Sequence, residues 1–428
     1  MIKPTKLAIK SKQSSFWSKL KKPLFVIAPM ANVTDYAFRT MFAKYGKPDV
    51  MWNEFVSADG LCSPVGRKKL LLDLKFSNKE RPIVAQLFTG HPEQMRKATV
   101  LVRKLKFDGM DINMGCPDKS VEKQGGGSAH IKDPKNAIEV IRAAREGWVG
   151  NKLENEERRM KKGETIQVPI SKFQNDQLIN IPISVKTRIG YNKEEIDTWI
   201  RLLLEQRLPA LTVHLRTRKE MSEVPAHWDL MPKIVALRDE ISPETLIIGN
   251  GDVNTLEEAR EKIATYGCDG VMIGRGIFGK PWFFARINEG KYSEKSSRET
   301  GSDSTVLKKM SSDGISVTAV KNEKDTIGRV GGVAHTMATE SYKSIKKVDA
   351  LEKSPEERLK ILLEHTKLFE KTYCGKIKTK NFAVMKKHFK AYVNGWEGAK
   401  ELRVKLMEAN SYKEVKGVVS DYLQIRDK

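Results

Sequence analysis

The chain has 428 residues, enough for more than one domain, and 39% of them are hydrophobic. No apolar run is long enough to cross a bilayer, so the sequence predicts no transmembrane helix and no membrane partner. The formal net charge of +23 favours a polyanionic partner, and nucleic acid is the first candidate. The four cysteines are scattered and include no Cys-x-x-Cys pair, which argues against a disulfide framework or a zinc site and for a reducing compartment.

Residues 1–22 carry several lysines and no acidic residue, and they lack the apolar core of a secretory signal. We interpret them as a basic N-terminal tail of a cytoplasmic protein. A mitochondrial presequence is the alternative, but such presequences are rich in arginine and this stretch contains none.

Short apolar segments alternate with amphipathic ones from Leu24 onward, which is the pattern of repeated β/α units. Eight such units over about 260 residues predict an α/β fold, a (β/α)8 TIM barrel at 23–287. A doubly wound open sheet is the alternative, but it calls for a glycine fingerprint after the first strand, where the chain reads Pro29-Met-Ala-Asn-Val-Thr34. We expect strands at 24–30, 50–56, 83–88, 109–116, 183–189, 210–216, 246–252 and 270–276, and helices at 92–105, 134–145, 193–206, 255–266 and after Phe278.

Two polar stretches interrupt the pattern. Residues 151–180 are charged and stand where a short connection to the fifth strand would suffice, so we expect a surface insertion. Residues 288–351 are rich in Ser, Lys, Gly and Thr and predict a disordered linker.

The remaining residues, 352–428, predict a small helical RNA-binding domain. Ser354 is a good N-cap for a first helix, and further helices are expected at 380–393 and 398–409. The basic run in the middle of this region contains no acidic residue, and its interleaved aromatic residues are expected to form the core. Phosphate neutralisation explains such a run better than a solvated helix face does, and from it we assign to RNA Lys378, Lys380, Lys386 and Lys387.

Polar residues stand at the ends of nearly all the predicted strands, and in a barrel these ends share one face. Glycines after the seventh and eighth strands, together with the Arg275 guanidinium, indicate a phosphate site. Lys186 suits the electron-rich edge of a reduced ring, and Gln86 offers both a donor and an acceptor to a planar heterocycle. A phosphate and a planar redox ring together suggest flavin mononucleotide (FMN).

The sequence also resembles the tRNA-dihydrouridine synthase family over Leu24 to about Ala285. The matching motifs are Ala28-Pro-Met-Ala-Asn-Val-Thr-Asp35, Asp111-Ile-Asn-Met-Gly-Cys-Pro117, Gln124-Gly-Gly-Gly-Ser-Ala129, Val185-Lys-Thr-Arg-Ile-Gly190, Val213-His-Leu-Arg-Thr217, Ile248-Gly-Asn-Gly-Asp252 and Met272-Ile-Gly-Arg-Gly276.

The resemblance implies a TIM barrel that reduces uridine to 5,6-dihydrouridine in tRNA. Cys116 would be the catalytic proton donor to C5, reduced FMN would give a hydride to C6, and NADPH would reduce the flavin. The implied FMN ligands are Pro29, Met30, Ala31, Gln86, Lys186, His214, Asn250, Gly251, Asp252, Gly274 and Arg275. We assign the strand-end residues Asn113, Arg188 and Arg216 to the RNA substrate.

Two other functions stay open at the level of sequence. One is an FMN-dependent oxidoreductase of a free pyrimidine, of the dihydroorotate type, and the other is a non-catalytic RNA-binding factor. We expect no metal and favour a monomer. The sequence does not indicate which uridine would be reduced.

Overall fold

The computed structural model describes residues 15–150, 178–287, 353–375 and 379–426. The predicted linker and all but the last residues of the predicted insertion lie outside these ranges. Contacts group residues 1–285 and 358–428 into one compact unit and 286–357 into another. No helix in the described ranges is long and apolar enough to cross a membrane.

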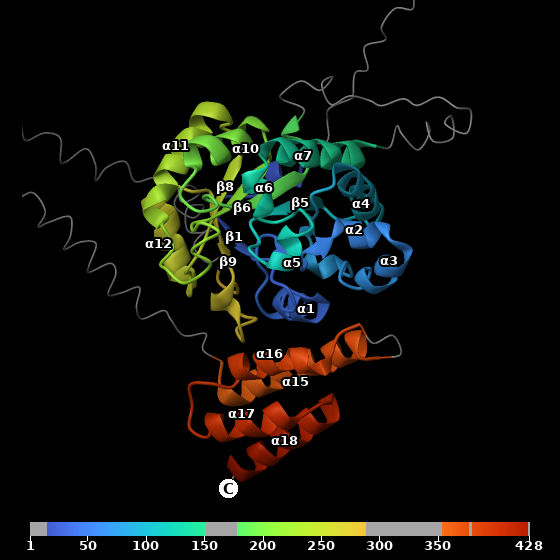
Figure 1. The fold of residues 1–428 in the computed structure, drawn as a ribbon. Helices are drawn as coiled ribbons and strands as arrows, with labels where there is room; N and C mark the ends of the chain where they lie inside the picture. The colour runs from blue at the N-terminus through green and yellow to red at the C-terminus, as the bar shows by residue number, and fades with distance from the viewer. Residues whose placement is uncertain (1–14, 151–177, 288–352, 376–378, 427–428) are drawn as a thin grey trace, which may run out of the picture. The chain divides into compact units, whose positions relative to one another are not determined.

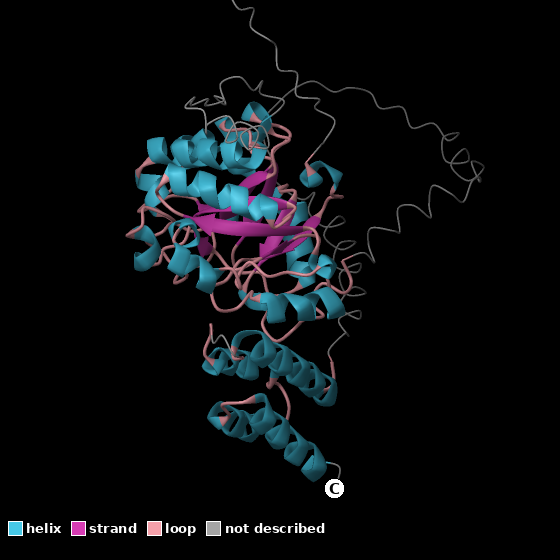
Figure 2. Ribbon diagram, turned by 90° about the vertical axis from the view of Figure 1, so that its right-hand side faces the viewer, coloured by secondary structure: helices cyan, strands magenta, loops and turns pink. Residues whose placement is uncertain are grey.

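The strands form a parallel sheet that closes into a barrel, with helices around it (Figures 1 and 2). Closure occurs beside the first strand, where Ile27 N donates to Val50 O at 3.4 Å and Asp49 N donates to Phe25 O at 2.9 Å. The predicted (β/α)8 barrel is therefore confirmed. In the order of the sheet the strands are β1 (Leu24–Ile27), β9 (Gly270–Ile273), β8 (Leu246–Asn250), β7 (Ala210–His214), β6 (Ile183–Arg188), β5 (Gly109–Met114), β4 (Ile83–Phe88) and β2 (Met51–Trp52), while β3 (Val56–Ser57) also pairs with β4.

The second barrel strand is broken into β2 and β3, both of which pair with β4. Between β2 and β3 the side chain of Asn53 bonds to β4 in place of a main-chain group: its Oδ1 accepts from Gln86 N at 2.7 Å. The break frees the next residue, Glu54, from the ladder. A continuous strand at 50–56 was predicted, and its centre is irregular for this reason.

The other strands lie where the sequence predicts them, but most end earlier. The ladder bonds stop at Ile27, Met114, His214, Asn250 and Ile273, and the residues that follow form the loops of the site. Apolar residues and glycines also occur in the loops that follow these strands. The sequence pattern therefore does not show where the hydrogen bonding between strands ends.

The helices follow the strands in chain order and cover the outside of the barrel (Figure 1). They are α1 (Tyr36–Tyr45), α2 (Ala58–Cys62), α3 (Pro64–Leu70), α4 (Pro92–Lys104), α5 (Lys119–Glu122), α6 (Ala129–Lys132), α7 (Pro134–Val149), α10 (Arg201–Glu205), α11 (Met231–Ile241) and α12 (Leu256–Tyr266). Short 3-10 turns are η1 (Phe16–Lys19), η2 (Asn78–Glu80), η5 (Trp228–Leu230) and η6 (Arg275–Ile277).

Two predicted helices differ from the structure. The one at 193–206 begins as a π-helical turn, η4 (Ile196–Ile200), before α10. Between Phe278 and Ile287 the described chain forms no regular helix. Instead, i to i+3 bonds such as Phe283 N to Lys280 O close successive turns up to Ile287.

The basic tail is shorter than predicted, because residues from Ser15 onward belong to the barrel. The Trp17 indole is 2% exposed and packs in the barrel interior at a ring-centroid distance of 5.8 Å from Trp52. An ion pair between Lys22 and Asp269 also joins this segment to the barrel. The N-terminal segment therefore contributes core.

The C-terminal helices are α15 (Pro355–Tyr373), η8 (Phe382–Val384), α16 (Met385–Tyr392), α17 (Ala399–Glu408) and α18 (Tyr412–Arg426), of which α18 was not predicted. The aromatic residues of the basic run form their core, as predicted: Phe389 and Tyr392 are almost fully buried. The same hydrophobic cluster includes Ala37 and Met41 of α1, so these helices share a core with the barrel.

Replacement of Trp17 by alanine tests the barrel-filling role of this segment. We expect Trp17→Ala to lower the free energy of unfolding by about 3–5 kcal/mol, because it empties a large volume in a closed core. Urea unfolding followed by circular dichroism measures the change. Lys19→Ala, at an exposed position of the same turn, is the control, and equal stability of the two variants would contradict a role in the core.

Candidate active site

The turn after β5 presents the thiol of Cys116 at the rim of the barrel. Asn113 Oδ1 accepts two main-chain hydrogen bonds, from Gly115 N at 3.2 Å and from Cys116 N at 2.9 Å. This arrangement replaces the lost ladder with a side-chain cap, so the chain turns sharply at the end of the strand. The half-exposed thiol is thus fixed by its own strand.

Behind this turn lies a chain of buried amides that begins at a carboxylate. Asp111 accepts from Gln86 Nε2 at 2.6 Å and from Ser184 Oγ at 2.6 Å, and Gln86 Oε1 accepts from Asn113 Nδ2 at 3.2 Å. Gln86 has no exposed surface and is bonded at both ends of its amide. The side chain of Gln86, predicted to contact a ligand ring, is thus bonded to Asp111 and Asn113. Asn113 itself, predicted to contact substrate, uses its amide mainly to hold the turn.

The Cys116 thiol is held in its protonated form. Burial raises its pKa above the ordinary thiol value, and the nearby charge of Asp118 adds to this, while Lys186 and Arg188 oppose it. A thiol of this kind is neutral near pH 7, which suits a proton donor and not a nucleophile.

Two cations of β6 lie beside this thiol. Burial and the charge of Arg188 lower the pKa of Lys186 to about 8, and Asp111 and Cys116 oppose the shift. Among the described residues, the Lys186 ammonium has neither a hydrogen-bond acceptor nor an ion-pair partner. Arg188 instead bonds three carbonyl oxygens, those of Gly115, Thr217 and Met221. The positive charge of Lys186 is thus available to a ligand.

A second polar group forms at the ends of β7, β8 and β9. Arg216 pairs with Asp252, donates to Val224 O and approaches His214 Nε2 at 3.2 Å. Because arginine is always a donor, His214 accepts on Nε2 and carries its proton on Nδ1. Burial, followed by the charges of neighbouring cations, keeps the pKa of His214 well below its ordinary value. His214 is therefore a neutral donor.

Asp252 serves the arginines and not a ligand directly. It lies between Arg216 and Arg275, whose Nη2 is 2.9 Å from Asp252 Oδ1. Arg275 remains 65% exposed. Asp252 was predicted to contact the cofactor, and the structure places it as the anchor of Arg275. Arg216 was predicted to contact RNA, and its guanidinium is likewise engaged within the protein.

The glycines that follow β8 and β9 differ in the space beside them. Gly251 has φ +136°, and a Cβ there would come within 2.6 Å of Ala226 Cβ, so only glycine fits. At Gly274 a Cβ would meet only Ala28 Cβ and Met30 Sδ, both at 3.7 Å. Of the predicted residues 29–31, Met30 therefore lies next to Gly274. Asn250 spans the same edge, because its Nδ2 donates to Met272 O at 2.8 Å.

Lys380 is not an exposed phosphate contact, contrary to the prediction. Its side chain is 8% exposed, pairs with Glu54 and lies 3.7 Å from Asp73. These carboxylates come from the loops after β2 and α3, so the lysine binds the barrel. Of the other predicted lysines, Lys387 is exposed, Lys386 is half-buried and Lys378 lies outside the described residues.

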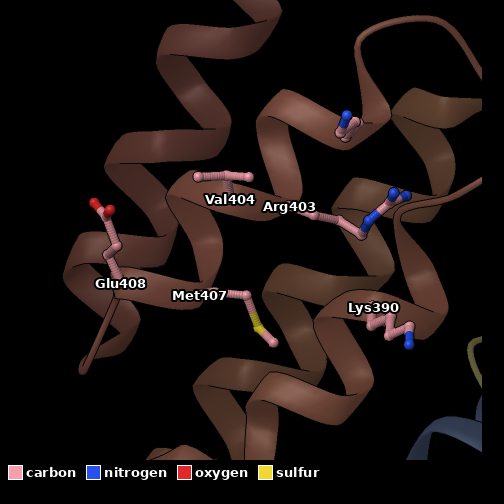
Figure 3. A pocket seen from close by; sticks show the side chains of 6 residues that line it. Lys390, Arg403, Val404, Met407 and Glu408 are labelled. Atoms are coloured by element: carbon pink, nitrogen blue, oxygen red, sulfur yellow. The ribbon is translucent and has the colours of Figure 1, made fainter.

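A shallow pocket of about 500 Å³ lies on the C-terminal helices (Figure 3). Lys390 comes from α16, while Lys400 and Arg403 belong to α17. Val404 and Met407 expose apolar surface beside these cations, at 58% and 43%. The sequence analysis missed Lys400 and Arg403 because acidic residues are interspersed along α17, although their spacing of three places them on one helix face.

Within the described ranges, no group of three or more His, Cys, Asp or Glu side chains is placed to hold a metal ion.

The effect of Lys186 on the thiol is measurable through alkylation. Because the ammonium favours the thiolate, we expect Lys186→Met to raise the pKa of Cys116 and to slow its modification by iodoacetamide by roughly threefold. The difference should shrink above pH 8, where Lys186 loses its own proton. Peptide mass spectrometry reads the rate at Cys116 alone. Lys97→Met on α4 is the control, and equal rates for all three proteins at pH 7 would contradict the coupling.

Comparison with known proteins agrees with this arrangement. The dihydrouridine synthase family model matches residues 26–154 and 160–329. A probable tRNA-dihydrouridine synthase of Staphylococcus aureus (strain COL) is 33% identical over 411 residues, which cover 96% of each chain. A probable tRNA-dihydrouridine synthase 2 of Bacillus subtilis (strain 168) is 39% identical over 286 residues, covering 67% of this chain and 77% of that protein.

Among solved structures, morphinone reductase in complex with tetrahydroNAD is similar at a TM-score of 0.38 and 11% identity, covering 63% of this chain and 88% of that one. The old yellow enzyme homologue from Zymomonas mobilis has the same TM-score at 12% identity, covering 62% and 88%. Likeness of this degree carries no functional weight, whereas the sequence matches extend over almost the whole chain. The chain belongs to the dihydrouridine synthase family.

Proposed function

We propose that the protein reduces uridine to 5,6-dihydrouridine in tRNA, with FMN as cofactor and NADPH as reductant. Family membership supports the reaction class, and the observation that carries the proposal is the partly buried thiol of Cys116, held by Asn113 at the end of β5. It lies beside Lys186, whose ammonium has no hydrogen-bond or ion-pair partner among the described residues. The curated relatives are named for action on tRNA and are bacterial, which favours a cytoplasmic location over a mitochondrial one.

The residues at the strand ends fit FMN. Lys186 supplies a cation without an anion, and His214 supplies a neutral N–H donor. Gly274 leaves space beside the backbone after β9, and Arg275, anchored by Asp252, provides a guanidinium for the phosphate. Asn250 and residues 29–31 complete the proposed cradle.

Reduced FMN supplies the hydride that C6 of the uracil ring accepts. Cys116 donates its proton to C5, and the thiolate is then reprotonated from solvent. Lys186 and Arg188 offset the negative charge left on the sulfur, because both favour the thiolate. The target base has to leave its stack to reach a site at the barrel rim, so the enzyme recognises folded RNA and extrudes one nucleotide.

The RNA contacts proposed for the C-terminal helices are exposed or half-buried cations of α16 and α17. Lys386 and Lys387 remain from the sequence analysis, and the pocket of Figure 3 adds Lys390, Lys400 and Arg403. Lys380 is omitted because its charge is neutralised by Glu54. Cations separated by helical repeats suit successive phosphates of a backbone.

Replacement of the thiol tests the acid. We expect Cys116→Ala to lower dihydrouridine formation about 10²- to 10⁴-fold, the usual contribution of a positioned general acid. FMN content and RNA affinity should stay unchanged. The measurement is mass spectrometric quantitation of dihydrouridine in an unmodified tRNA transcript after single turnover. Cys62→Ala, at a thiol in the α2 helix, is the matched control.

Several outcomes would contradict the proposal. Full activity of the Cys116→Ala protein would remove the acid assignment. A colourless wild-type protein that cannot be reconstituted with FMN would refute the flavin. Turnover of free uracil or orotate without RNA would favour a free-pyrimidine oxidoreductase instead.

Removal of surface lysines tests the RNA contacts. We expect Lys387→Ala and Lys390→Ala each to weaken tRNA binding and to reduce the slope of log affinity against log salt by about 1, because each releases about one counterion on binding. Filter binding at several salt concentrations measures the slope. Lys97→Ala on α4 is the charge-matched control, and equal slopes for all the proteins would rule out these contacts.

A further inference from the structure

The main-chain carbonyls of the cysteine turn, residues 115–117, are each held by a side chain. Gly115 O accepts from Arg188 Nε at 2.8 Å. Cys116 O accepts from Ser128 Oγ at 2.8 Å, and Pro117 O accepts from Arg218 Nη2 at 3.3 Å. Asn113 holds the amides of the same turn from the opposite side. The peptide planes on both sides of the thiol are thus fixed by donors from the loops after β5, β6 and β7.

Two of these donors converge on one carboxylate, that of Glu122 on α5. Glu122 Oε2 accepts from Arg218 Nη2 at 2.6 Å, and Glu122 Oε1 accepts from the Tyr191 hydroxyl at 2.9 Å. Ser128 Oγ also lies 3.0 Å from Glu122 Oε1, so its single proton is shared between this carboxylate and Cys116 O. The Glu122 side chain is 15% exposed and that of Arg218 is 22% exposed. Burial by itself would raise the pKa of Glu122, but the bonds from Arg218, Tyr191 and Ser128 outweigh it and lower that pKa.

The loops that carry these donors are bonded to one another as well. Arg218 N donates to Gly190 O at 2.9 Å, and Lys219 N donates to Tyr191 O at 2.9 Å. The Tyr191 ring also receives two cations, with Lys132 Nζ at 4.8 Å and the Arg218 guanidinium at 5.6 Å from its centroid. Glu122 therefore anchors a network that spans three loops and ends at the thiol.

We propose that Glu122 is a positioning residue for Cys116, acting through Arg218 on the carbonyl of Pro117. This inference rests on the proposed function, in which the Cys116 thiol gives its proton to C5 of a uracil ring. Proton transfer requires a short and well-aligned approach, and a misplacement of about 1 Å costs roughly 10²-fold in rate. Glu122 itself touches neither the thiol nor the reacting atoms.

Replacement of Glu122 by glutamine keeps the size of the side chain but turns one acceptor into an N–H donor facing Arg218 and Tyr191. In the holoenzyme we expect the rate at which tRNA reoxidises the reduced flavin to fall at least tenfold at saturating tRNA, with little change in KM. Flavin reduction by NADPH should be unchanged, because that step does not use the thiol. Tyr191→Phe removes one donor only and should give a smaller loss, of roughly threefold.

A second readout does not depend on flavin chemistry. Because the Arg218 restraint on the turn is loosened, iodoacetamide should modify Cys116 faster in Glu122→Gln than in wild type at the same pH, as read by peptide mass spectrometry. The matched control is Glu93→Gln on α4, where the carboxylate pairs with Arg96 and Lys97 on the surface. It should leave flavin reoxidation and alkylation as in wild type.

The two readouts separate failure of this inference from failure of the proposed function. Unchanged reoxidation and unchanged alkylation in Glu122→Gln would overturn the positioning role. A higher KM for tRNA with the same maximal rate would also overturn it, since Arg218 would then bind RNA directly. A wild-type protein without flavin or product would refute the function, while the alkylation rates would still report whether Glu122 holds the thiol.

Discussion

A buried carboxylate at the centre of the barrel, Asp111, determines how the site is arranged. It lies within β5, has no exposed surface and binds the side chains of neighbouring strands through Gln86 and Ser184. From Gln86 the bonds continue to Asn113 and then to the main-chain amides of the cysteine turn. Each buried polar group in this series needs a hydrogen-bond partner, so each of these side chains has only one workable orientation. The thiol is located by that requirement.

Burial and charge oppose each other across the same strands. Burial raises the pKa of Asp111 to about 6 and lowers that of Lys186 to about 8, although each group favours the charged form of the other. The positive charge at the rim exceeds the negative charge inside, since Lys186 has no anion of its own in the described chain while the arginines are bonded to Asp252 or to carbonyls. An anionic ligand with a planar ring would stabilise this arrangement. The same cations favour the thiolate that remains once Cys116 has lost its proton.

Sequence alone identified the barrel because most of its strands are short, largely apolar runs with buried residues on both faces, and because polar residues mark their ends. It did not identify positions that depend on a partner far away in the chain. Trp17 looked like part of a tail, yet it fills the barrel interior. The sequence predicts that Gln86 and Asp252 contact the cofactor, and in the structure both side chains are bonded to other side chains of the protein. Glu122 and Arg218 were not singled out because nothing local in the chain shows that they meet, 96 residues apart.

The role of Lys380 also depends on a partner far away in the chain. This lysine links the C-terminal helices to the site. It pairs with Glu54, whose other oxygen accepts from Asn32 N in the loop after β1, and Tyr36 N donates to the Tyr373 hydroxyl at 2.9 Å. Burial raises the pKa of nearby Asp35 to about 7. Between 3.8 and about 7 the folded protein thus binds a proton that the unfolded chain has released, so the contribution of Asp35 to stability falls as pH rises. Lys380 opposes that loss. A lysine that reads as a phosphate contact therefore stabilises the loop proposed to hold FMN.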